Sequence, residues 1–323
     1  MPTHWMISNR NPTSSTLGTT RSALTYWTSD SHDLHKLSSW RQVPNAAAFR
    51  TLLAAAADAF PTYAETDHTR QHHVTLFVHG YNNSFEDAAR RYESLCRSLF
   101  HGPRSLGHCV LFTWPSNGKV YGYLPDREDA RASAPDLASV LNTLYDWMLA
   151  KQHETAQPNG IPCKAKTSIL AHSMGNYVLQ HAMQYAWTRN NQPLLVSLVN
   201  QLVMIAADVD NDLFASGELQ AGTDGDAIAN LTYRVTALYS GRDDVLGVSA
   251  GLKHFGKRRL GRSGLDRAQP PSDNVWDVDC TPLFGKRTKD IHSAYFETEK
   301  TLALLRDVLR GIDRTVLKSM HGI

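Results

Sequence analysis

Short apolar runs recur along the middle and later parts of the chain, and amphipathic segments lie between them. The runs are Val74–Val78, Cys109–Thr113, Thr167–Ala171, Leu202–Ala206 and Tyr233–Tyr239. Each is five to seven residues long, and apolar runs of that length are typical of strands buried on both faces of a sheet. The pattern therefore predicts five central strands.

The clearest amphipathic segment begins after Ser84, which is expected to cap a helix with apolar residues at helical spacing from Phe85 to Leu99. Further helices are expected at Ala46–Phe60, Leu137–Met148, Tyr177–Tyr185 and about Ala294–Leu309. Strands that alternate with helices predict a parallel sheet, because each crossover helix returns the chain to the same end. The predicted fold class is α/β, with a mostly parallel central sheet and helices on both faces.

Two stretches lack this regular pattern. Residues 1–45 are rich in Ser, Thr and Asn, which predicts an irregular N-terminal arm. Residues 247–285 are polar, basic and poorly periodic, which indicates a long loop or a small lid. No further boundary is evident, so residues 46–323 are expected to form a single domain.

The candidate nucleophile is Ser173, in the sequence Ala171-His172-Ser173-Met174-Gly175. It follows a predicted strand and precedes a predicted helix, the context of the strained turn that exposes a nucleophilic serine in the α/β-hydrolase fold. Small residues two positions to either side let the backbones approach, and the backbone N–H of Met174 could bind an oxyanion. The alternative is a chance match at an ordinary strand-to-helix turn.

A second oxyanion donor is expected from the loop after the first central strand. The backbone of Tyr81 is the best candidate, with Gly80 before it allowing close approach to a substrate. A simple glycine turn before the Ser84 cap is a compatible interpretation. His79 is interpreted as a structural residue beneath the site.

A nucleophilic serine requires a histidine base and an acid that orients it, and in this fold the chain order is Ser, acid, His. His292 is the preferred base, because it lies just before the last predicted helix. His181 precedes any acid, His254 lies in a basic stretch, and His321 is near the C-terminus.

The acid should follow a late strand. Asp243 and its neighbour Asp244 follow Tyr233–Tyr239, and only one of the two can point at the base. Asp243 is preferred, and Asp208 and Asp210 after the preceding strand are the fallback. The carboxylates without this role are expected to be turn residues or helix caps.

Composition excludes some other classes of function. The chain has 323 residues and a net charge of +2, so no strong field favours nucleic acid or an anionic membrane. The four cysteines are widely spaced without zinc-ligand spacing and are interpreted as free thiols of a reducing compartment. No secretory signal and no apolar run of roughly 18 residues is visible. A cytoplasmic protein without a transmembrane segment is expected; its oligomeric state stays open.

Six sequence pieces together resemble a family of bacterial α/β hydrolases known mainly as a domain of unknown function. They are Val78-His79-Gly80-Tyr81-Asn82, Phe112-Thr113-Trp114-Pro115-Ser116, Tyr123-Leu124-Pro125-Asp126-Arg127-Glu128, Ala171-His172-Ser173-Met174-Gly175, Ala207-Asp208-Val209-Asp210 and His292-Ser293-Ala294-Tyr295-Phe296. The resemblance implies a hydrolase with Ser173, Asp243 and His292 in the matching positions. The chain departs from the family pattern by the extra residue Ala294.

The resulting hypothesis is a serine hydrolase that cleaves carboxylic esters, from small molecules or lipids, through an acyl-enzyme. No metal or organic cofactor is needed. Trp114, Tyr121 and Tyr123 are expected to line the substrate pocket or to pack under a loop. One alternative is a membrane-surface phospholipase that uses the basic stretch Lys253–Arg262 on anionic headgroups. Another is a non-catalytic α/β-hydrolase scaffold that binds a ligand or partner.

Overall fold

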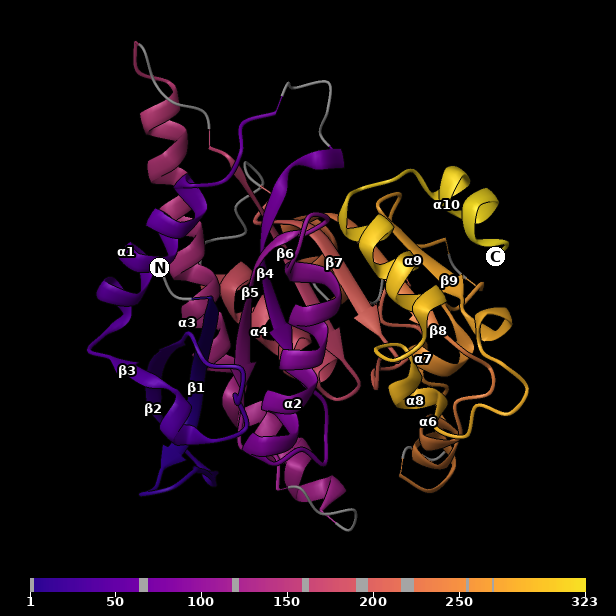
Figure 1. Cartoon of the computed structure of the whole chain (residues 1–323). Coiled ribbons are helices and arrows are strands. Elements are labelled where there is room, and N and C mark those ends of the chain that lie inside the picture. Colours follow the sequence, from indigo (N-terminus) through magenta and orange to yellow (C-terminus); the bar gives the residue numbers. More distant parts are fainter. Residues whose placement is uncertain are drawn as a thin grey trace.

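A mixed sheet of nine strands, in the order β3-β2-β1-β5-β4-β6-β7-β8-β9, forms the centre of the protein (Figure 1). This is a computed structural model, and it describes residues 3–63, 69–117, 122–158, 163–189, 197–215, 224–253, 256–268 and 270–323. The strands are β1 His4–Pro12, β2 Leu17–Ser29, β3 Arg41–Val43, β4 His72–Val78, β5 Gly107–Thr113, β6 Ala165–His172, β7 Val199–Ile205, β8 Thr232–Tyr239 and β9 Val275–Asp279. All neighbours from β1 to β9 pair in parallel, and β2 and β3 add antiparallel pairs at one edge. The predicted mostly parallel sheet is confirmed.

Helices cover both faces of this sheet, as predicted. They are α1 Ala46–Asp58, α2 Phe85–Leu95, α3 Tyr123–Thr155, α4 Gly175–Arg189, α5 Asp224–Leu231, α6 Asp244–Val248, α7 Leu260–Ser263, α8 Ile291–Ala294, α9 Glu299–Leu309 and α10 Arg314–His321. Short 3-10 turns lie at Leu37–Ser39 and Thr281–Leu283, and π-helical turns at Cys96–Phe100 and Ser249–Lys253. Side chains alternate between the faces along each strand: Val78 belongs to the apolar cluster that includes residues of α1, α3, α4 and α5, whereas Phe77 belongs to the cluster that includes residues of α2, α9 and α10.

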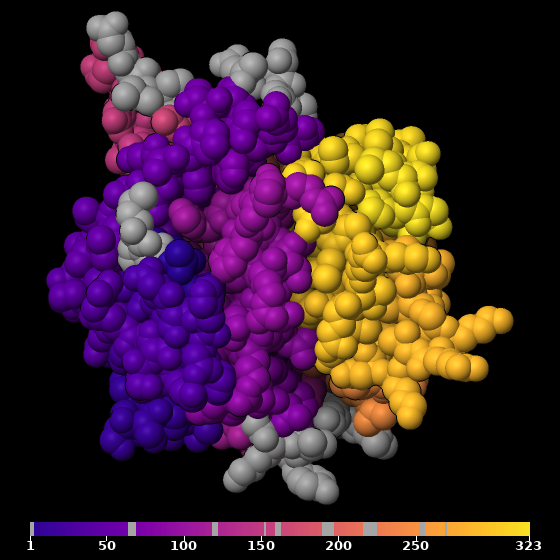
Figure 2. All heavy atoms as spheres, in the orientation of Figure 1, coloured from indigo at the N-terminus to yellow at the C-terminus, as the bar shows by residue number. Residues whose placement is uncertain are grey.

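The C-terminal helices close the second face against an early part of the chain. Figure 2 shows the yellow C-terminal segment lying beside the purple segment that contains α2. A hydrogen bond contributes to this packing: Nη2 of Arg306 on α9 donates to the carbonyl of Ser98 at 2.7 Å. The chain end is therefore packed onto the same layer as the helix that follows β4.

The prediction of an irregular arm over residues 1–45 was wrong, because β1, β2 and β3 lie there. The polar composition misled because polar side chains of β1 are buried and hydrogen-bonded inside the fold. Asn9 donates to Asp136 at 2.8 Å, and Arg10 is fully buried. Since β1 pairs with β5, this segment is part of the central sheet.

The stretch 247–285 is not simply a loop or a lid. It contributes α7 and the edge strand β9, which pairs in parallel with β8 from Val235↔Val275 to Tyr239↔Asp279. Its weak periodicity reflects the short elements and the many turns that connect them. Residues 254, 255 and 269 within it lie outside the described part of the chain.

Four histidines are buried in the described residues: His4 on β1, and three that lie on or just after β4 and β6. His73 lies on β4 and shares a 2.6 Å hydrogen bond with Ser168. His79 follows β4 directly, and His172 is the last residue of β6. Burial lowers the pKa of His73 and of His79 to about 3 and lowers the pKa of His172 well below its usual value. All three imidazoles are therefore neutral in the folded protein at neutral pH.

We expect the free energy of unfolding to fall as the pH drops from about 6.5 towards 4. Over this window the histidines become protonated in the unfolded chain but stay neutral when they are buried in the folded protein. Each such group lowers the free energy of unfolding by about 1.4 kcal/mol per pH unit. Urea unfolding at a series of pH values measures the slope. His73→Gln should make the slope shallower, and His153→Gln, at an exposed position, should leave it unchanged; a flat wild-type profile would contradict the expectation.

Candidate active site

Ser173 occupies a strained turn between β6 and α4. Its φ is +52°, in the left-handed region that non-glycine residues rarely adopt. The turn is held from both sides: the Ser173 N–H donates to the Ile205 carbonyl at 3.0 Å, and the Asp208 N–H donates to the Ser173 carbonyl at 3.2 Å. Asn176 adds a bond from its side-chain amide to the Ala171 carbonyl at 2.9 Å. The surrounding strands therefore fix the serine in its unusual conformation.

Two glycines let the neighbouring backbones reach this turn. A Cβ on Gly175 would lie 2.5 Å from the carbonyl oxygen of His79, and a Cβ on Gly80 would lie 2.7 Å from the Cβ of Ser173. Both distances are shorter than real carbon contacts allow. The loop after β4 therefore lies directly against the serine, as the sequence predicts.

A chain of hydrogen bonds joins Ser173 to His292 and His292 to Asp243. The Oγ of Ser173 lies 2.8 Å from Nε2 of His292, and Oδ2 of Asp243 lies 2.8 Å from Nδ1. An ionised carboxylate can only accept, so Nδ1 carries the ring proton and Nε2 is left to accept from the serine hydroxyl. The structure thus brings together the three residues singled out from sequence, from positions 119 and 49 residues apart.

Of the two adjacent carboxylates, Asp243 faces His292 and Asp244 faces solvent. The Asp243 side chain is completely buried, and its Oδ1 accepts from the N–H of Leu246 at 3.0 Å, which caps α6. The Asp244 side chain is 94% exposed, and its nearest cation is Arg262 at 3.6 Å. The capping bond holds one oxygen of Asp243 while the other meets the imidazole.

The fallback carboxylates are engaged elsewhere. Arg259 is fully buried, and its guanidinium pairs with Asp208 at 2.9 Å and with Asp210. Asp208 also accepts from the hydroxyls of Tyr123 at 2.7 Å and Ser249 at 3.1 Å. These groups tie α3, β7 and the start of the 247–285 stretch together beside the Ser173 turn.

Two of the other candidate bases, His181 and His321, are engaged elsewhere. His181 packs edge-on against Tyr177 within α4, at 4.5 Å between ring centroids. His321 lies in α10 and bonds Asp307 at 3.0 Å. His254 lies outside the described residues.

His172 supports His292, the candidate base, through a contact that the sequence did not suggest. Its Nε2 lies 2.9 Å from the backbone carbonyl of His292, and the two rings are 4.9 Å apart. Because burial keeps the ring neutral and the carbonyl can only accept, Nε2 carries the proton. The residue before the serine therefore positions the backbone of the base. No pattern in the sequence indicates this, since the contact spans 120 residues.

His79 and Trp114 form the layer beneath the loop after β4. Their rings stack at 5.4 Å with an interplanar angle of 5°, and Nε1 of Trp114 donates to the His79 carbonyl at 2.9 Å. The Trp114 N–H also donates to Nε2 of His79 at 3.2 Å. His79 is thus a structural residue, as interpreted from sequence.

Arg10 of β1 anchors the same loop, and nothing in the sequence pointed to it. Its fully buried guanidinium donates to the carbonyl of Asn83 at 2.8 Å, to that of Ser116 at 3.2 Å and to the Thr113 hydroxyl at 2.9 Å. Burial lowers its pKa to about 10, so it stays charged at neutral pH. One side chain thereby joins the loops that follow β4 and β5.

Asp126 joins those two loops to α3. Its buried carboxylate accepts from the Ser116 hydroxyl at 2.5 Å, from the Asn117 N–H at 2.9 Å and from the Asn82 N–H at 3.4 Å. The Trp-Pro-Ser and Tyr-to-Asp-Arg motifs of the sequence therefore meet around one carboxylate, a contact that their separation did not reveal.

The aromatic residues expected at a substrate pocket need a correction. Trp114 is 0% and Tyr123 4% exposed, so both pack in the core, the alternative weighed from sequence. Tyr121 lies outside the described residues. Tyr81 lies on the loop beside Ser173 with its ring 5.5 Å from that of Tyr123. Met174 begins the turn into α4, and in the part of the chain that the structure describes no hydrogen-bond acceptor faces its backbone N–H.

Metal-binding clusters and membrane-spanning helices are both absent from the described ranges. Nowhere in them do three His, Cys, Asp or Glu side chains gather as they would around a metal ion. No helix among those same residues combines the length and apolarity required to cross a bilayer.

Comparison with known proteins gives a family and a partial match to one further protein. The family described as alpha/beta hydrolase of unknown function (DUF900) matches residues 56–303. The uncharacterized protein alr1448 of Nostoc sp. is 28% identical over 133 residues, 35% of this chain and 31% of that protein. This match spans about a third of that relative.

Two solved structures show a weak likeness. Phospholipase PlaB from Legionella pneumophila in complex with thio-NAD is 13% identical, with a TM-score of 0.39, over 77% of this chain and 61% of that one. Lipase B from Aspergillus fumigatus is 14% identical, with a TM-score of 0.37, over 86% and 62%. The match therefore covers less than two thirds of either solved chain.

Proposed function

The chain belongs to a family of α/β hydrolases of unknown function, and on that premise we propose that it is a serine hydrolase that cleaves carboxylic esters. The observation that carries the proposal is the continuous set of hydrogen bonds from Ser173 through His292 to Asp243. A nucleophile next to a base that is itself oriented by a buried carboxylate is the arrangement that acyl transfer requires.

In the proposed reaction, Nε2 of His292 takes the hydroxyl proton as Oγ of Ser173 attacks the ester carbonyl. The backbone N–H groups of Met174 and Tyr81 bind the negative oxygen that forms, a contribution of roughly 3–4 kcal/mol for each donor. The imidazolium, stabilised by Asp243, then gives its proton to the departing alcohol. Water, activated by the same imidazole, attacks the acyl-enzyme and releases the acid and the free serine.

The supporting residues hold the proposed site in a fixed geometry. Gly80 permits the loop after β4 to lie against Ser173, and Arg10 and Asp126 hold that loop and its neighbour in place. Preorganised donors stabilise the charge of the transition state without reorganising during the reaction, and in many enzymes this stabilisation contributes most of the rate enhancement.

The basic stretch favours a structural role over binding to anionic headgroups. Arg259 is buried against Asp208, and Lys257 lies 3.1 Å from Asp210 and 3.7 Å from Asp212. Both of these cations are paired with carboxylates of the protein, which supports our proposal of an esterase over a phospholipase that binds anionic membranes through this stretch.

Labelling with a fluorophosphonate probe tests the proposal. The purified protein should form one covalent adduct, and mass spectrometry of the digested protein should locate it on the peptide that contains Ser173. A panel of p-nitrophenyl esters of increasing acyl length then tests the ester substrate. A folded protein that neither labels nor hydrolyses any ester would favour the non-catalytic scaffold.

Gly80→Ala should lower kcat/KM by about 100-fold, because displacement of reacting groups by about 1 Å has an effect of that size. The added Cβ would lie 2.7 Å from the Cβ of Ser173, so the loop must move away from the nucleophile. Gly251→Ala is the matched control, since a Cβ there meets nothing within 4 Å. Ester kinetics of both variants measure the effect, and equal activity would contradict the assigned role of Gly80.

A further inference from the structure

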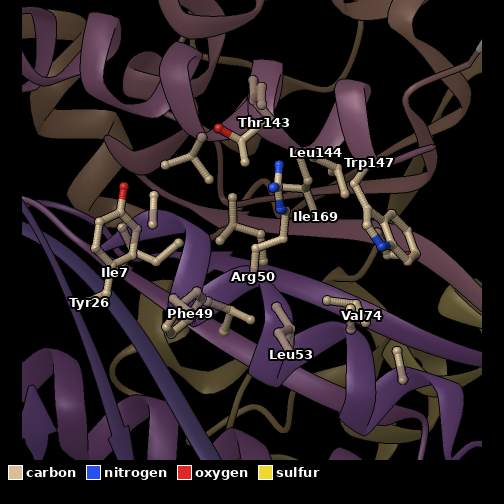
Figure 3. A pocket seen from close by; sticks show the side chains of 18 residues that line it. Ile7, Tyr26, Phe49, Arg50, Leu53, Val74, Thr143, Leu144, Trp147 and Ile169 are labelled. Carbon is tan, nitrogen blue, oxygen red and sulfur yellow. The ribbon is translucent and has the colours of Figure 1, made fainter. Parts of the chain in front are cut away.

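A cavity lies between α1 and α3, over the sheet (Figure 3). Its floor consists of apolar side chains of the central strands, among them Ile7, Val74 and Ile169. Ser173, His292 and Asp243 are not among the residues that line it. The cavity has a volume of about 120 Å³.

The sequence of α1 explains why a space remains there. The helix contributes three small side chains to the cavity wall, Ala46, Ala54 and Ala57, beside its larger residues Phe49, Arg50 and Leu53. At the far end of α1 the two helices are joined, because Nζ of Lys151 on α3 lies 3.4 Å from Asp58. The small residues of α1 therefore leave part of the space open, beside the ion pair that joins the two helices.

The cavity carries one cation among apolar groups. Two of its polar side chains are satisfied internally: the Thr143 hydroxyl donates to the Ser139 carbonyl at 3.0 Å, and Ser168 bonds His73. Arg50 differs, because within the described ranges no hydrogen bond, ion pair or ring contact engages its guanidinium. Figure 3 shows that group directed from α1 across the cavity towards Thr143.

We propose that this cavity binds an anionic amphiphile, namely a medium-chain carboxylate with its alkyl chain among the apolar side chains and its carboxylate on Arg50. Planar guanidinium groups match carboxylates with two parallel hydrogen bonds. An apolar cavity of about 150 Å³ holds one benzene molecule, so this space of about 120 Å³ encloses about five carbons of the alkyl chain, and the rest of the ligand lies at the open side beside exposed Arg50. The inference does not depend on the activity of Ser173, since the site is separate.

The test is titration of the whole protein with octanoate, followed by calorimetry and by tryptophan fluorescence, since Trp147 lines the cavity. Saturable binding at one site is expected. Arg50→Gln should weaken octanoate binding by about tenfold, the effect of losing a hydrogen bond to a charged group, and should leave 1-octanol binding unchanged. Arg131→Ala, at an exposed position on α3 outside the cavity, should bind octanoate as the wild type does.

A second set of variants separates this cavity from the Ser173 site. Ala54→Phe should fill the space and abolish binding of both octanoate and 1-octanol, whereas Ser173→Ala should bind both normally. Absence of octanoate binding, equal affinity of Arg50→Gln and wild type, or loss of binding after fluorophosphonate labelling of Ser173 would overturn the proposal. Because Arg50 is exposed, its substitution leaves the fold intact and keeps the test decisive.

Discussion

Ser173→Ala should lower kcat for ester hydrolysis by about 10⁵- to 10⁶-fold, the loss seen when the nucleophile of a serine hydrolase is removed. In the proposed mechanism this hydroxyl is the group that forms the acyl-enzyme, so the substitution removes the nucleophile. The serine is 5% exposed. Alanine differs from it only by the hydroxyl that bonds His292, so the substitution removes little of the packing. Steady-state kinetics with a p-nitrophenyl ester, together with probe labelling, measure the result.

Thermal unfolding of the same variant distinguishes chemistry from folding. We expect a melting temperature close to that of the wild type, because alanine also fits the turn and only one hydroxyl is lost. Ser94→Ala, at an exposed position on α2, is the matched control and should retain full activity. Hydrolysis or labelling that persists in Ser173→Ala would show that another residue is the nucleophile.

Asp243→Asn should lower kcat by about 10⁴-fold, as loss of the orienting carboxylate does in a Ser-His-Asp triad. Asparagine keeps the shape of the side chain, and its carbonyl oxygen can still accept from the Leu246 N–H that caps α6. Its amide N–H, however, then faces Nδ1 of His292. The ring must carry its proton on Nε2, where it can no longer accept from Ser173.

Asp244→Asn is the control for this substitution, because it makes the same chemical change one residue away. Its side chain points into solvent, so we expect activity within twofold of wild type, about the effect of an exposed ion pair. Ester kinetics and melting temperatures of the two variants should be compared. If Asp244→Asn lost activity and Asp243→Asn kept it, the two carboxylates would have to exchange roles.

The central strands and the order of the site residues were predictable because the signals are local. An apolar run such as Val74–Val78 indicates a strand that is buried on both faces of a sheet. This run lies in β4, as predicted. The sequence order of serine, acid and histidine follows from the order in which a parallel sheet presents its loops. Asp243 and Asp244 could not be separated fully from sequence, since the direction of each side chain depends on the start of α6.

The N-terminal strands and the supporting residues were not predictable for the opposite reason. Ser8, Asn9 and Arg10 look like loop residues until their partners, far along the chain, are known. Arg10 reaches Thr113 across 103 residues, and no period or motif in β1 records that contact. The prediction that Trp114 lines the substrate pocket was wrong, because an aromatic side chain after a strand is equally compatible with a core position and with a substrate site.

The position of Arg10 affects how the protein can be shortened. The part of the chain that matches the family begins at residue 56, after β1, β2 and β3. A fragment trimmed to the family boundaries would remove the donor that holds the carbonyls of Asn83 and Ser116. It would also leave β5 as an unpaired edge, a surface that invites aggregation. Expression of the minimal matched region should therefore give an insoluble or inactive product, even though the three residues of the site are all retained.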